Sequence, residues 1–420
     1  MKIVEDDEPR PVEFVGAGGY GVPLPFTNSS RRPPEPPAPD PPRRRWWWLV
    51  STGVPVLLLV TLYLSARTTT APSAQPETPP EVKKALIDAG LAAQSEALLG
   101  GDLAAYLRFV DAPLHAEFTQ RFHSLRALRV GRWSATVTRM PLDLDDEANI
   151  DVGVGYCLGD KDCVPVKMVL SSRWTVRDGR AVATTFQRTT LPWDVTPLEG
   201  VTGRRVIVAG PASVAGQLPQ IVAAADQAAE VADRYARWEP PPKRYVVYVA
   251  ADEQVGYWWI DEGATAAWTH GIAVQAGQQG LTNLLAHEFT HVVSLRRGQR
   301  PEWWLSEGLA EYVADRAGSS TRDRLPSVRR FLQAGGWDGE VAYHGPPPGT
   351  PEDERLARLG LALLTVTCLA DRFGEDRMLA FFAAVVRDES TPEWAAPALL
   401  GTDWAPVAAA CSAEIRGKVN

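Results

Sequence analysis

Two histidines and a glutamate in this sequence have the spacing of a metal centre. They lie in the run His287-Glu288-Phe289-Thr290-His291, which places the two histidines four residues apart. On a helix, residues four apart share a face, and two imidazoles side by side can bind one Zn²⁺. Glu288 lies between them, where its carboxylate would act as general base toward a water molecule at the metal. The run therefore predicts a catalytic zinc centre, provided that it is helical.

The residues on both sides of this run have the period of a helix. Apolar residues recur three and four positions apart between 284 and 295, and Gly298 is suited to a C-terminal cap. We therefore expect an amphipathic helix that carries the run near its middle. The alternative is an ordinary amphipathic helix whose two histidines bind no metal.

A third ligand is expected in the next helical segment, since a catalytic zinc site uses three protein ligands and leaves one position open. That segment begins after Pro301, and it contains Glu307, Gly308 and Glu311. Glu307 is the expected ligand, and Gly308 beside it would let the two helices approach closely. Glu311 lies one turn later, where it can accept the free ring N–H of a ligand histidine. The alternative is a solvated glutamate face, but the tryptophans and leucines around Glu307 argue against exposure.

Together, the run 287–291 and the segment Trp304-Leu305-Ser306-Glu307-Gly308-Leu309-Ala310-Glu311-Tyr312 resemble the gluzincin metallopeptidases. The sequence is most similar to the peptidase MA-like domains of bacterial envelope proteins. The resemblance implies that His287, His291 and Glu307 bind zinc and that Glu288 is the base. It covers the region from about residue 201 to 420, although its specific motifs lie within 287–312.

One departure from the family narrows the expected activity. Aminopeptidases of the gluzincin group carry a Gly-x-Met-Glu-Asn motif on the strand before the zinc helix. The corresponding stretch, residues 269–275, reads Thr-His-Gly-Ile-Ala-Val-Gln and has no glutamate to hold a substrate amino terminus. We therefore expect cleavage within a chain, or an unusual substrate, and not aminopeptidase activity. Residues 272–274 would form an edge strand, which can bind an extended peptide.

Peptide hydrolysis also needs a donor that stabilises the oxyanion besides the metal. Tyr343 and His344 lie downstream in a loop-like stretch, and His270 lies on the strand side of the expected zinc helix. Each has the chemistry of a donor, and Tyr343 is our prediction among them. The alternative is that all three are ordinary loop residues.

The N-terminal region predicts a membrane anchor. Residues 1–45 are rich in proline and glycine and are expected to be a disordered cytoplasmic tail. Residues 46–66 then contain an apolar run long enough to span a bilayer, preceded by three arginines that keep the N-terminus inside. Residues 67–80 are expected to be an extracytoplasmic linker. A cleavable signal peptide is the alternative, but a tail of this length before the apolar run argues against it.

Charge and cysteines agree with an extracytoplasmic protein. The formal net charge of −8 argues against nucleic acid as a partner. Cys157 and Cys163 enclose a Gly/Asp turn between two strand-like runs, which predicts a local disulfide. Cys368 and Cys411 can form a second bridge, but four cysteines allow three connectivities and the sequence leaves this pairing open.

Residues 81–200 are expected to form a separate α+β domain. Helical patterns at 82–87 and 98–107, with Asp102 as a cap, precede strand patterns at 134–140, 150–156, 164–170 and 173–176. This order, and the Leu-x-x-Gly-Asp-Leu pattern at 98–103, is similar to NTF2-like domains. Without a catalytic constellation, this domain is expected to bind or position rather than catalyse.

Residues 201–420 are expected to form a zincin-type metallopeptidase domain with a small sheet and a mostly helical C-terminal part. Strand patterns at 205–210 and 244–249 flank a helix at 217–238, and helices are expected at 356–373 and 378–386. The predicted protein is thus an α+β, single-pass, extracytoplasmic zinc metallopeptidase with a peptide or protein substrate. The alternative is a non-catalytic envelope binding or scaffolding protein that keeps a zinc site. Glu288 separates the two, because a structural site has no need of it.

Overall fold

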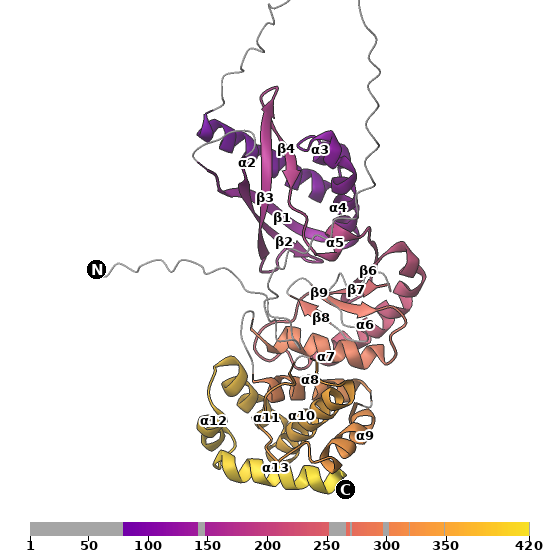
Figure 1. Cartoon of the computed structure of the whole chain (residues 1–420), viewed down its shortest axis with the longest axis vertical. Coiled ribbons are helices and arrows are strands. Elements are labelled where there is room, and N and C mark those ends of the chain that lie inside the picture. The colour runs from indigo at the N-terminus through magenta and orange to yellow at the C-terminus, as the bar shows by residue number, and fades with distance from the viewer. Residues whose placement is uncertain are drawn as a thin grey trace, which may run out of the picture. The chain divides into compact units, whose positions relative to one another are not determined.

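The computed structural model describes residues 79–141, 148–251, 266–268, 271–296, 302–318, 320–347 and 349–419. The predicted tail, membrane helix, most of the linker, and His270 lie outside these residues. Among the described residues, no helix has the length and apolar character to cross a membrane. From residue 80 on, these residues belong to one compact unit that mixes helices with two small sheets (Figure 1). The α+β class is confirmed, while the division at residues 200 and 201 stays a prediction.

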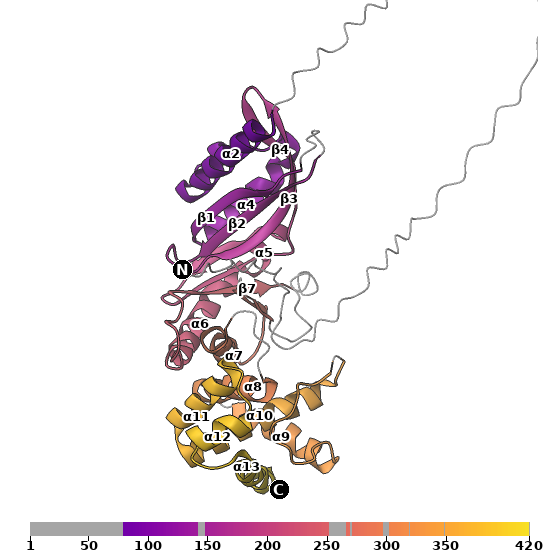
Figure 2. The ribbon, with the colours of Figure 1, turned by 90° about the vertical axis from the view of Figure 1, so that its left-hand side faces the viewer.

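The first part is a four-stranded antiparallel sheet preceded by helices, in the order that the sequence predicted. Helix α2 packs against the strands, as Figure 2 shows. The strands lie side by side in chain order: β1 (Val130–Arg139), β2 (Ile150–Leu158), β3 (Val166–Arg177) and β4 (Arg180–Phe186). The helices are α2 (Pro80–Gly100), α3 (Leu103–Leu107), the short η1 (Ala112–Leu114) and α4 (His115–Ala127). The predicted cap is confirmed, since the Asp102 side chain accepts a hydrogen bond from the Ala105 N–H at 2.9 Å.

One strand prediction was wrong. The patterns at 164–170 and 173–176 belong to a single strand, β3, and not to two. Ser172 lies between the two patterns, its side chain is buried, and its hydroxyl donates to the Ile150 carbonyl across the pair β2–β3. A serine with a buried partner can stay within a strand because its hydroxyl is satisfied there.

The predicted hairpin disulfide is confirmed. Cys157, at the end of β2, bonds to Cys163 with a Cα–Cα distance of 5.9 Å. The bridge closes the turn that leads into β3. Lys243 reaches this turn from the second part of the chain and pairs with Asp160 at 3.0 Å.

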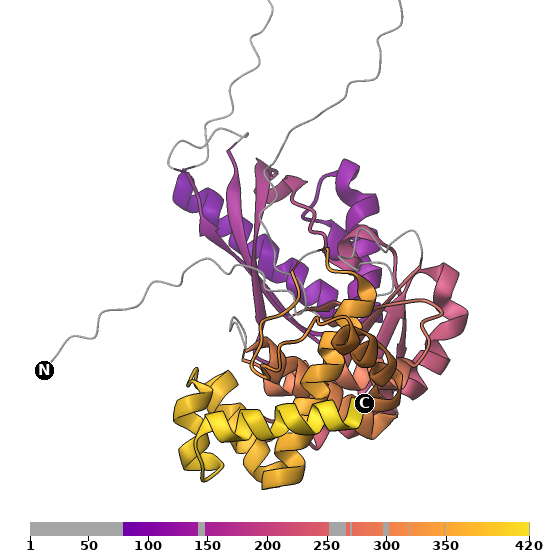
Figure 3. The same ribbon diagram turned by 60° about the horizontal axis from the view of Figure 1, so that its bottom comes forward.

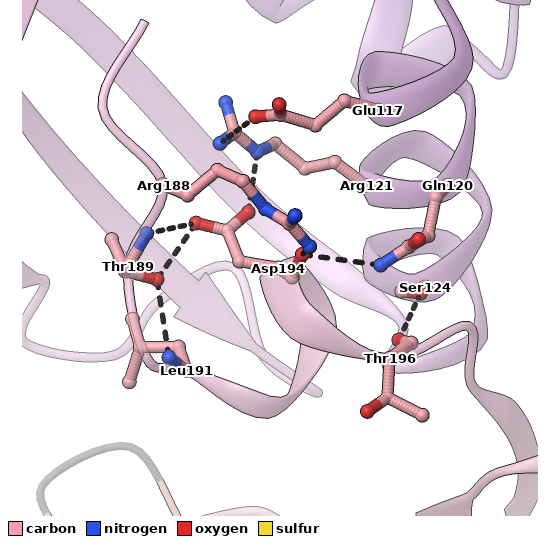
Figure 4. Close-up of polar contacts among 9 residues, drawn as sticks. All are labelled: Glu117, Gln120, Arg121, Ser124, Arg188, Thr189, Leu191, Asp194 and Thr196. Carbon is pink, nitrogen blue, oxygen red and sulfur yellow. Dashed lines mark hydrogen bonds and ion pairs between the residues drawn. The ribbon is translucent and has the colours of Figure 1, made fainter. Parts of the chain in front are cut away.

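A buried polar network fixes the segment that leads out of the first sheet (Figure 4). The Arg121 guanidinium on α4 pairs with Asp194 on α5 (Pro192–Val195), and both side chains are almost fully buried. The second carboxylate oxygen of Asp194 accepts hydrogen bonds from the Thr189 N–H and hydroxyl at 3.0 and 2.7 Å. The Asp194 carbonyl accepts from Gln120 and Arg188. Because the buried charges are paired and bonded, the network holds residues 188–194 against α4.

The second sheet has five strands in the order β5-β6-β7-β9-β8. Its central strands β6, β7 and β9 run parallel, and an antiparallel strand lies at each edge. Every residue of β6 is buried, as expected for a parallel strand covered on both faces. The strands are β5 (Glu199–Thr202), β6 (Val206–Gly210), β7 (Tyr245–Ala250), β8 (Ala266–Trp268) and β9 (Gly271–Gln275), and between β6 and β7 lie η2 (Ala212–Gln217) and α6 (Leu218–Asp233).

The prediction that residues 272–274 form an edge strand was wrong. They lie in β9, which is paired with β7 on one side and with β8 on the other. The pairing joins Ala267 to Ile272 in a very short antiparallel hairpin. Three residues are too few to show strand alternation in a sequence, so the outer strand gave no signal. The edge on this side of the described sheet is therefore β8.

The two faces of the second sheet contribute to different cores. One face, with Ile207, Tyr248 and Ala273, joins the core of the first part, where Trp193 and Tyr248 lie 6.4 Å apart between ring centroids. The other face packs against α6 and against α7 (Leu281–Ser294). The sheet thus supports α7, the helix that carries the histidine pair, on a core shared with α6.

The C-terminal part is helical, as predicted. Cys368 on α10 bonds to Cys411 on α13, with a Cα–Cα distance of 5.7 Å, which resolves the pairing that the sequence left open. Figure 3 shows α13 lying along the end of this helical part. The helices are α8 (Trp303–Ala317), α9 (Ser320–Gln333), α10 (Glu352–Phe373), α11 (Glu375–Phe382), the π-helical turn η4 (Ala383–Arg387), α12 (Pro392–Leu399) and α13 (Trp404–Val419).

Candidate metal centre

Helix α7 carries the histidine pair, as the periodicity predicted. It begins after Gly280, whose φ of 63° lies in the left-handed region that glycine adopts without strain. Leu285, Phe289 and Val293 are buried in the core with α6 and the sheet. The helix ends at Ser294, and the expected cap Gly298 lies outside the described residues. Because the apolar face of α7 packs against the sheet, the rotation of the helix is fixed, and with it the direction of the two histidine side chains.

Helix α8 supplies the expected third residue. It packs against α7 on one side and α10 on the other. Trp304, Leu305 and Leu309 are fully buried in the C-terminal core, so the rotation of α8 is fixed by apolar packing. Glu307 is consequently turned inward and is only 8% exposed. The alternative of a solvated glutamate face is excluded for this residue.

The three predicted ligands converge with the dimensions of a metal site. His287 Nε2 lies 3.2 Å from His291 Nε2 and 3.2 Å from Glu307 Oε2, and His291 Nε2 lies 3.6 Å from Glu307 Oε1. Ligand atoms bound tetrahedrally at about 2.0–2.1 Å are separated by about 3.3 Å. The observed spacing fits that value. Among the described residues this is the group whose ligand atoms can hold one metal ion.

The donor chemistry of the group also fits a cation. Two ring nitrogens and a carboxylate oxygen present lone pairs to the same small volume, where a single proton cannot satisfy all of them. His291 Nδ1 is buried without a hydrogen-bond partner among the described residues. On the same ring, Nε2 is the atom that lies near His287 and Glu307. A cation between them would satisfy all three lone pairs.

Burial and neighbouring charged groups have opposite effects on the pKa values of the ligand side chains. Burial alone would raise the pKa of Glu307, but the charge of His291 and the hydrogen bond to His287 hold it well below its usual range. Burial would lower the pKa of His287, but its hydrogen bonds to Glu307 and Glu311 raise it well above the ordinary value. The two shifts thus have opposite directions, downward for the carboxyl of Glu307 and upward for the imidazole of His287.

Glu311 takes the supporting position that its spacing predicted. Its Oε1 lies 3.4 Å from His287 Nδ1, on the side of the ring opposite to Glu307. Burial would raise its pKa, but the hydrogen bond and charge of His287, followed by the charge of Arg324, lower the pKa to about 2. The carboxylate therefore stays ionised and can hold the His287 ring by its Nδ1.

Sequence reasoning missed Arg324. This residue lies on α9, and its guanidinium donates to both oxygens of Glu311, at 2.9 and 3.3 Å. The two residues are thirteen positions apart and on different helices, so no periodicity connects them. The sequence contains no signal for this contact.

Glu288 lies between the two histidines on α7 and is buried. Its side chain is 7% exposed, and among the described residues its carboxylate has no hydrogen-bond partner. Burial raises its pKa, the charges of His287 and His291 lower it in part, and those of Glu307 and Glu311 raise it again, with a net upward shift. A raised pKa brings a carboxylate closer to neutral pH, where it exchanges protons with water more readily.

Tyr343 lies near the group but uses its hydroxyl elsewhere. Its ring packs against Trp303 at 5.8 Å between centroids. Burial raises the pKa of Tyr343 well above its ordinary value, and the charge of Glu307 adds a smaller upward effect. The hydroxyl donates to the Arg358 carbonyl on α10, so it does not face the three ligands. His344 is exposed. The role of Tyr343 as an oxyanion donor stays a prediction.

Comparison with known proteins adds nothing to these residues: no known family model matches the chain, and no curated protein matches it.

Proposed function

We propose that this protein is a membrane-anchored zinc metallopeptidase of the gluzincin, peptidase MA-like type, which cleaves peptide bonds outside the cytoplasm. The observation that carries the proposal is the convergence of His287, His291 and Glu307, with Glu288 next to His287 on α7 and without a hydrogen-bond partner among the described residues. A structural zinc site usually fills four positions with cysteine or histidine. Here the set has three ligands and an adjacent base, which is the composition of a hydrolytic centre.

Each residue then has a defined task. His287, His291 and Glu307 would hold the zinc ion, and Glu311 would fix the His287 ring. Bound there, zinc would lower the pKa of water and polarise a carbonyl group. Glu288 would accept a proton from the attacking water and deliver it to the leaving nitrogen, as its raised pKa allows. The short edge strand β8 offers backbone groups to an extended substrate.

The location rests on separate observations. Two disulfides favour an oxidising compartment. The three arginines before the apolar run at 46–66 favour an N-terminus in the cytoplasm and the remaining chain outside. The helices and antiparallel sheet of residues 81–200 would form an NTF2-like module that positions the peptidase or its substrate. Protease added to intact cells is expected to cut the chain after residue 66.

The proposal is tested with full-length protein and its Glu288→Gln variant. Both are expected to bind one zinc ion per chain, measured by elemental analysis. The wild type is expected to cleave members of a mixed peptide library, read by mass spectrometry, and the variant to be slower by at least about 100-fold. Glu352→Gln, an exposed residue at the start of α10, is the matched control and should retain wild-type cleavage.

The possible outcomes separate the proposed enzyme from the alternative protein. If the wild type holds no zinc after incubation with the metal, the centre is not a zinc site. Equal cleavage by wild type and Glu288→Gln contradicts the mechanism. Stoichiometric zinc without any cleavage would instead favour a non-catalytic envelope protein with a retained zinc site.

A further inference from the structure

The Glu311 carboxylate is buried between two groups from different helices. Its Oε1 lies 2.9 Å from Arg324 Nη2 and 3.4 Å from His287 Nδ1, while its Oε2 lies 3.3 Å from Arg324 Nε. Its side chain is only 2% exposed. A carboxylate so buried needs donors on its oxygens, and here Arg324 is the group that reaches both of them.

The orientation of the His287 ring depends on this carboxylate. The ring is held at both ends, by Glu307 at Nε2 and by Glu311 at Nδ1. A glutamate side chain has three rotatable bonds and can turn its oxygens away from the ring. A planar guanidinium that engages both oxygens fixes the plane of the carboxylate, which a single donor does not.

Helix α9, which carries Arg324, is fitted closely to α10. A Cβ atom on Gly360 of α10 would lie 2.4 Å from Val328 Cγ2 and 3.0 Å from the Arg324 Cβ. Glycine at this position therefore permits the approach of α9 that brings Arg324 to Glu311. On the next turn of α9, the Ser327 hydroxyl donates to Asp353 on α10 at 2.7 Å. The position of Arg324 is thus set by contacts that are independent of the metal site.

We propose that Arg324 is a positioning residue of the metal centre, which acts through Glu311 to hold His287 in the orientation that binds the metal. The chain of contacts runs from α9 through α8 to α7, and Gly360 fixes its outer end. This inference rests on the metal site proposed above, and it predicts that metal affinity depends on a residue that contacts none of the three ligands.

The first test is the Zn²⁺ affinity of the full-length Arg324→Met variant, measured by competition with a chromogenic chelator. We expect affinity about 10-fold lower than that of the wild type, the range found for residues that support metal ligands. The matched control is Arg329→Met on the same helix. Arg329 donates to the Val419 carbonyl and not to Glu311, so this variant should keep wild-type affinity.

A double-mutant cycle separates positioning from a general effect on folding. In Glu311→Gln, a neutral amide oxygen can still accept from His287 and needs no cation beside it. Arg324→Met should therefore change Zn²⁺ affinity less than about 2-fold in the Glu311→Gln background. The Co²⁺ absorption spectrum should change with Arg324→Met in the wild-type background only.

Other results of these measurements would contradict the proposed role of Arg324. An equal loss of affinity in both backgrounds would show that Arg324 acts through the fold, and unchanged affinity in Arg324→Met would contradict any role at the site. If Arg324→Met does not fold, Arg324→Lys replaces it in the double-mutant cycle. Lysine keeps the positive charge but lacks the planar guanidinium that engages both carboxylate oxygens. A wild type that binds no Zn²⁺ at all would instead contradict the proposed function itself.

Discussion

Gly308 on α8 lies against the Ala362 carbonyl of α10, so closely that a Cβ atom at residue 308 would be 2.7 Å from that oxygen. The same atom would lie 2.6 Å from Val366 Cγ2. Gly308 directly follows Glu307, the predicted carboxylate ligand. The residue that points into the metal group is therefore next to the one that lets α8 rest on α10. The prediction that Gly308 lets α8 approach the histidine helix α7 was wrong, since its nearest neighbours all belong to α10. The position of Glu307 is set by a helix–helix contact on the far side of α8.

Gly308→Ala is expected to destabilise the protein and weaken metal binding together. Alanine normally stabilises a helix relative to glycine, but here the added methyl group must push α8 away from α10. We expect a loss of about 2 kcal/mol in the free energy of unfolding, together with lower Zn²⁺ affinity. Denaturant unfolding and chelator competition measure the two effects.

Gly417→Ala is the matched control for this variant. Gly417 lies in α13 with no neighbouring atom within 4 Å of the added Cβ, so alanine should be neutral or stabilise by up to about 1 kcal/mol. If Gly308→Ala and Gly417→Ala behave alike, the close contact between α8 and α10 does not determine the position of Glu307.

The ligands were predictable because their relationships are local. One helical turn separates His287 from His291, and one turn separates Glu307 from Glu311. A spacing of four residues can be recognised from the sequence alone. Arg324 was not predictable, since it reaches Glu311 from another helix, and no sequence spacing connects the two.

In the fold as well, features that depend on neighbouring residues were predictable, and features that depend on distant residues were not. The strand patterns at 205–210 and 244–249 correspond to β6 and β7, because buried parallel strands form apolar runs. The position of β9 inside the sheet was missed, because it depends on pairing with three residues of β8. Likewise, the bridge between Cys368 and Cys411 depends on how α13 returns to α10, which no spacing encodes.

The two disulfides are expected to differ in their contribution to stability. The bridge between Cys368 and Cys411 spans 43 positions, whereas the bridge between Cys157 and Cys163 spans 6. In the loop-entropy account, replacing both cysteines by alanine should cost about 4 kcal/mol for the long loop and about 2 kcal/mol for the short one. Guanidinium unfolding of the two double variants measures this difference. A larger loss for the hairpin bridge would mean that loop entropy does not dominate here.

Replacing only one partner of the buried pair Arg121–Asp194 should strongly lower the free energy of unfolding. Asp194→Ala leaves the Arg121 guanidinium buried, with the 3.4 Å contact to Glu117 and the rings of Phe118 and Phe186 as its remaining neighbours, and we expect a loss of about 4 kcal/mol. The double variant Arg121→Met, Asp194→Ala removes the unpaired charge and should cost less than the sum of the two single changes. Thermal unfolding measures these free energies. Additive losses would indicate that the two groups are stabilised independently.

The partners of Arg121 and Asp194 described above lie between residues 117 and 194, and none of them belongs to the metal group. Folded Asp194→Ala protein is therefore expected to keep wild-type Zn²⁺ affinity, measured at a temperature well below its melting point. A parallel loss of Zn²⁺ affinity would show that segment 188–194 is coupled to α7 through the second sheet.

Asp353 should make the contact between α9 and α10 sensitive to acid. Hydrogen bonds from Arg330 and Ser327 lower its pKa from 3.8 to about 2, despite a small opposing effect of burial. In the unfolded chain the carboxyl regains its ordinary pKa, so between pH 4 and pH 2 the unfolded state binds more protons than the folded state. The stability due to this ionisation is present above pH 4 and is lost as the pH falls toward 2.

Asp353→Asn lacks the ionisation, so its stability should fall less over this interval than that of the wild type. Asp403→Asn, at an exposed turn before α13, is the control and should follow the wild type. Urea unfolding of the three proteins at pH 4, 3 and 2 measures the difference, and parallel curves for wild type and Asp353→Asn would mean that the contact with Arg330 and Ser327 is not formed in solution.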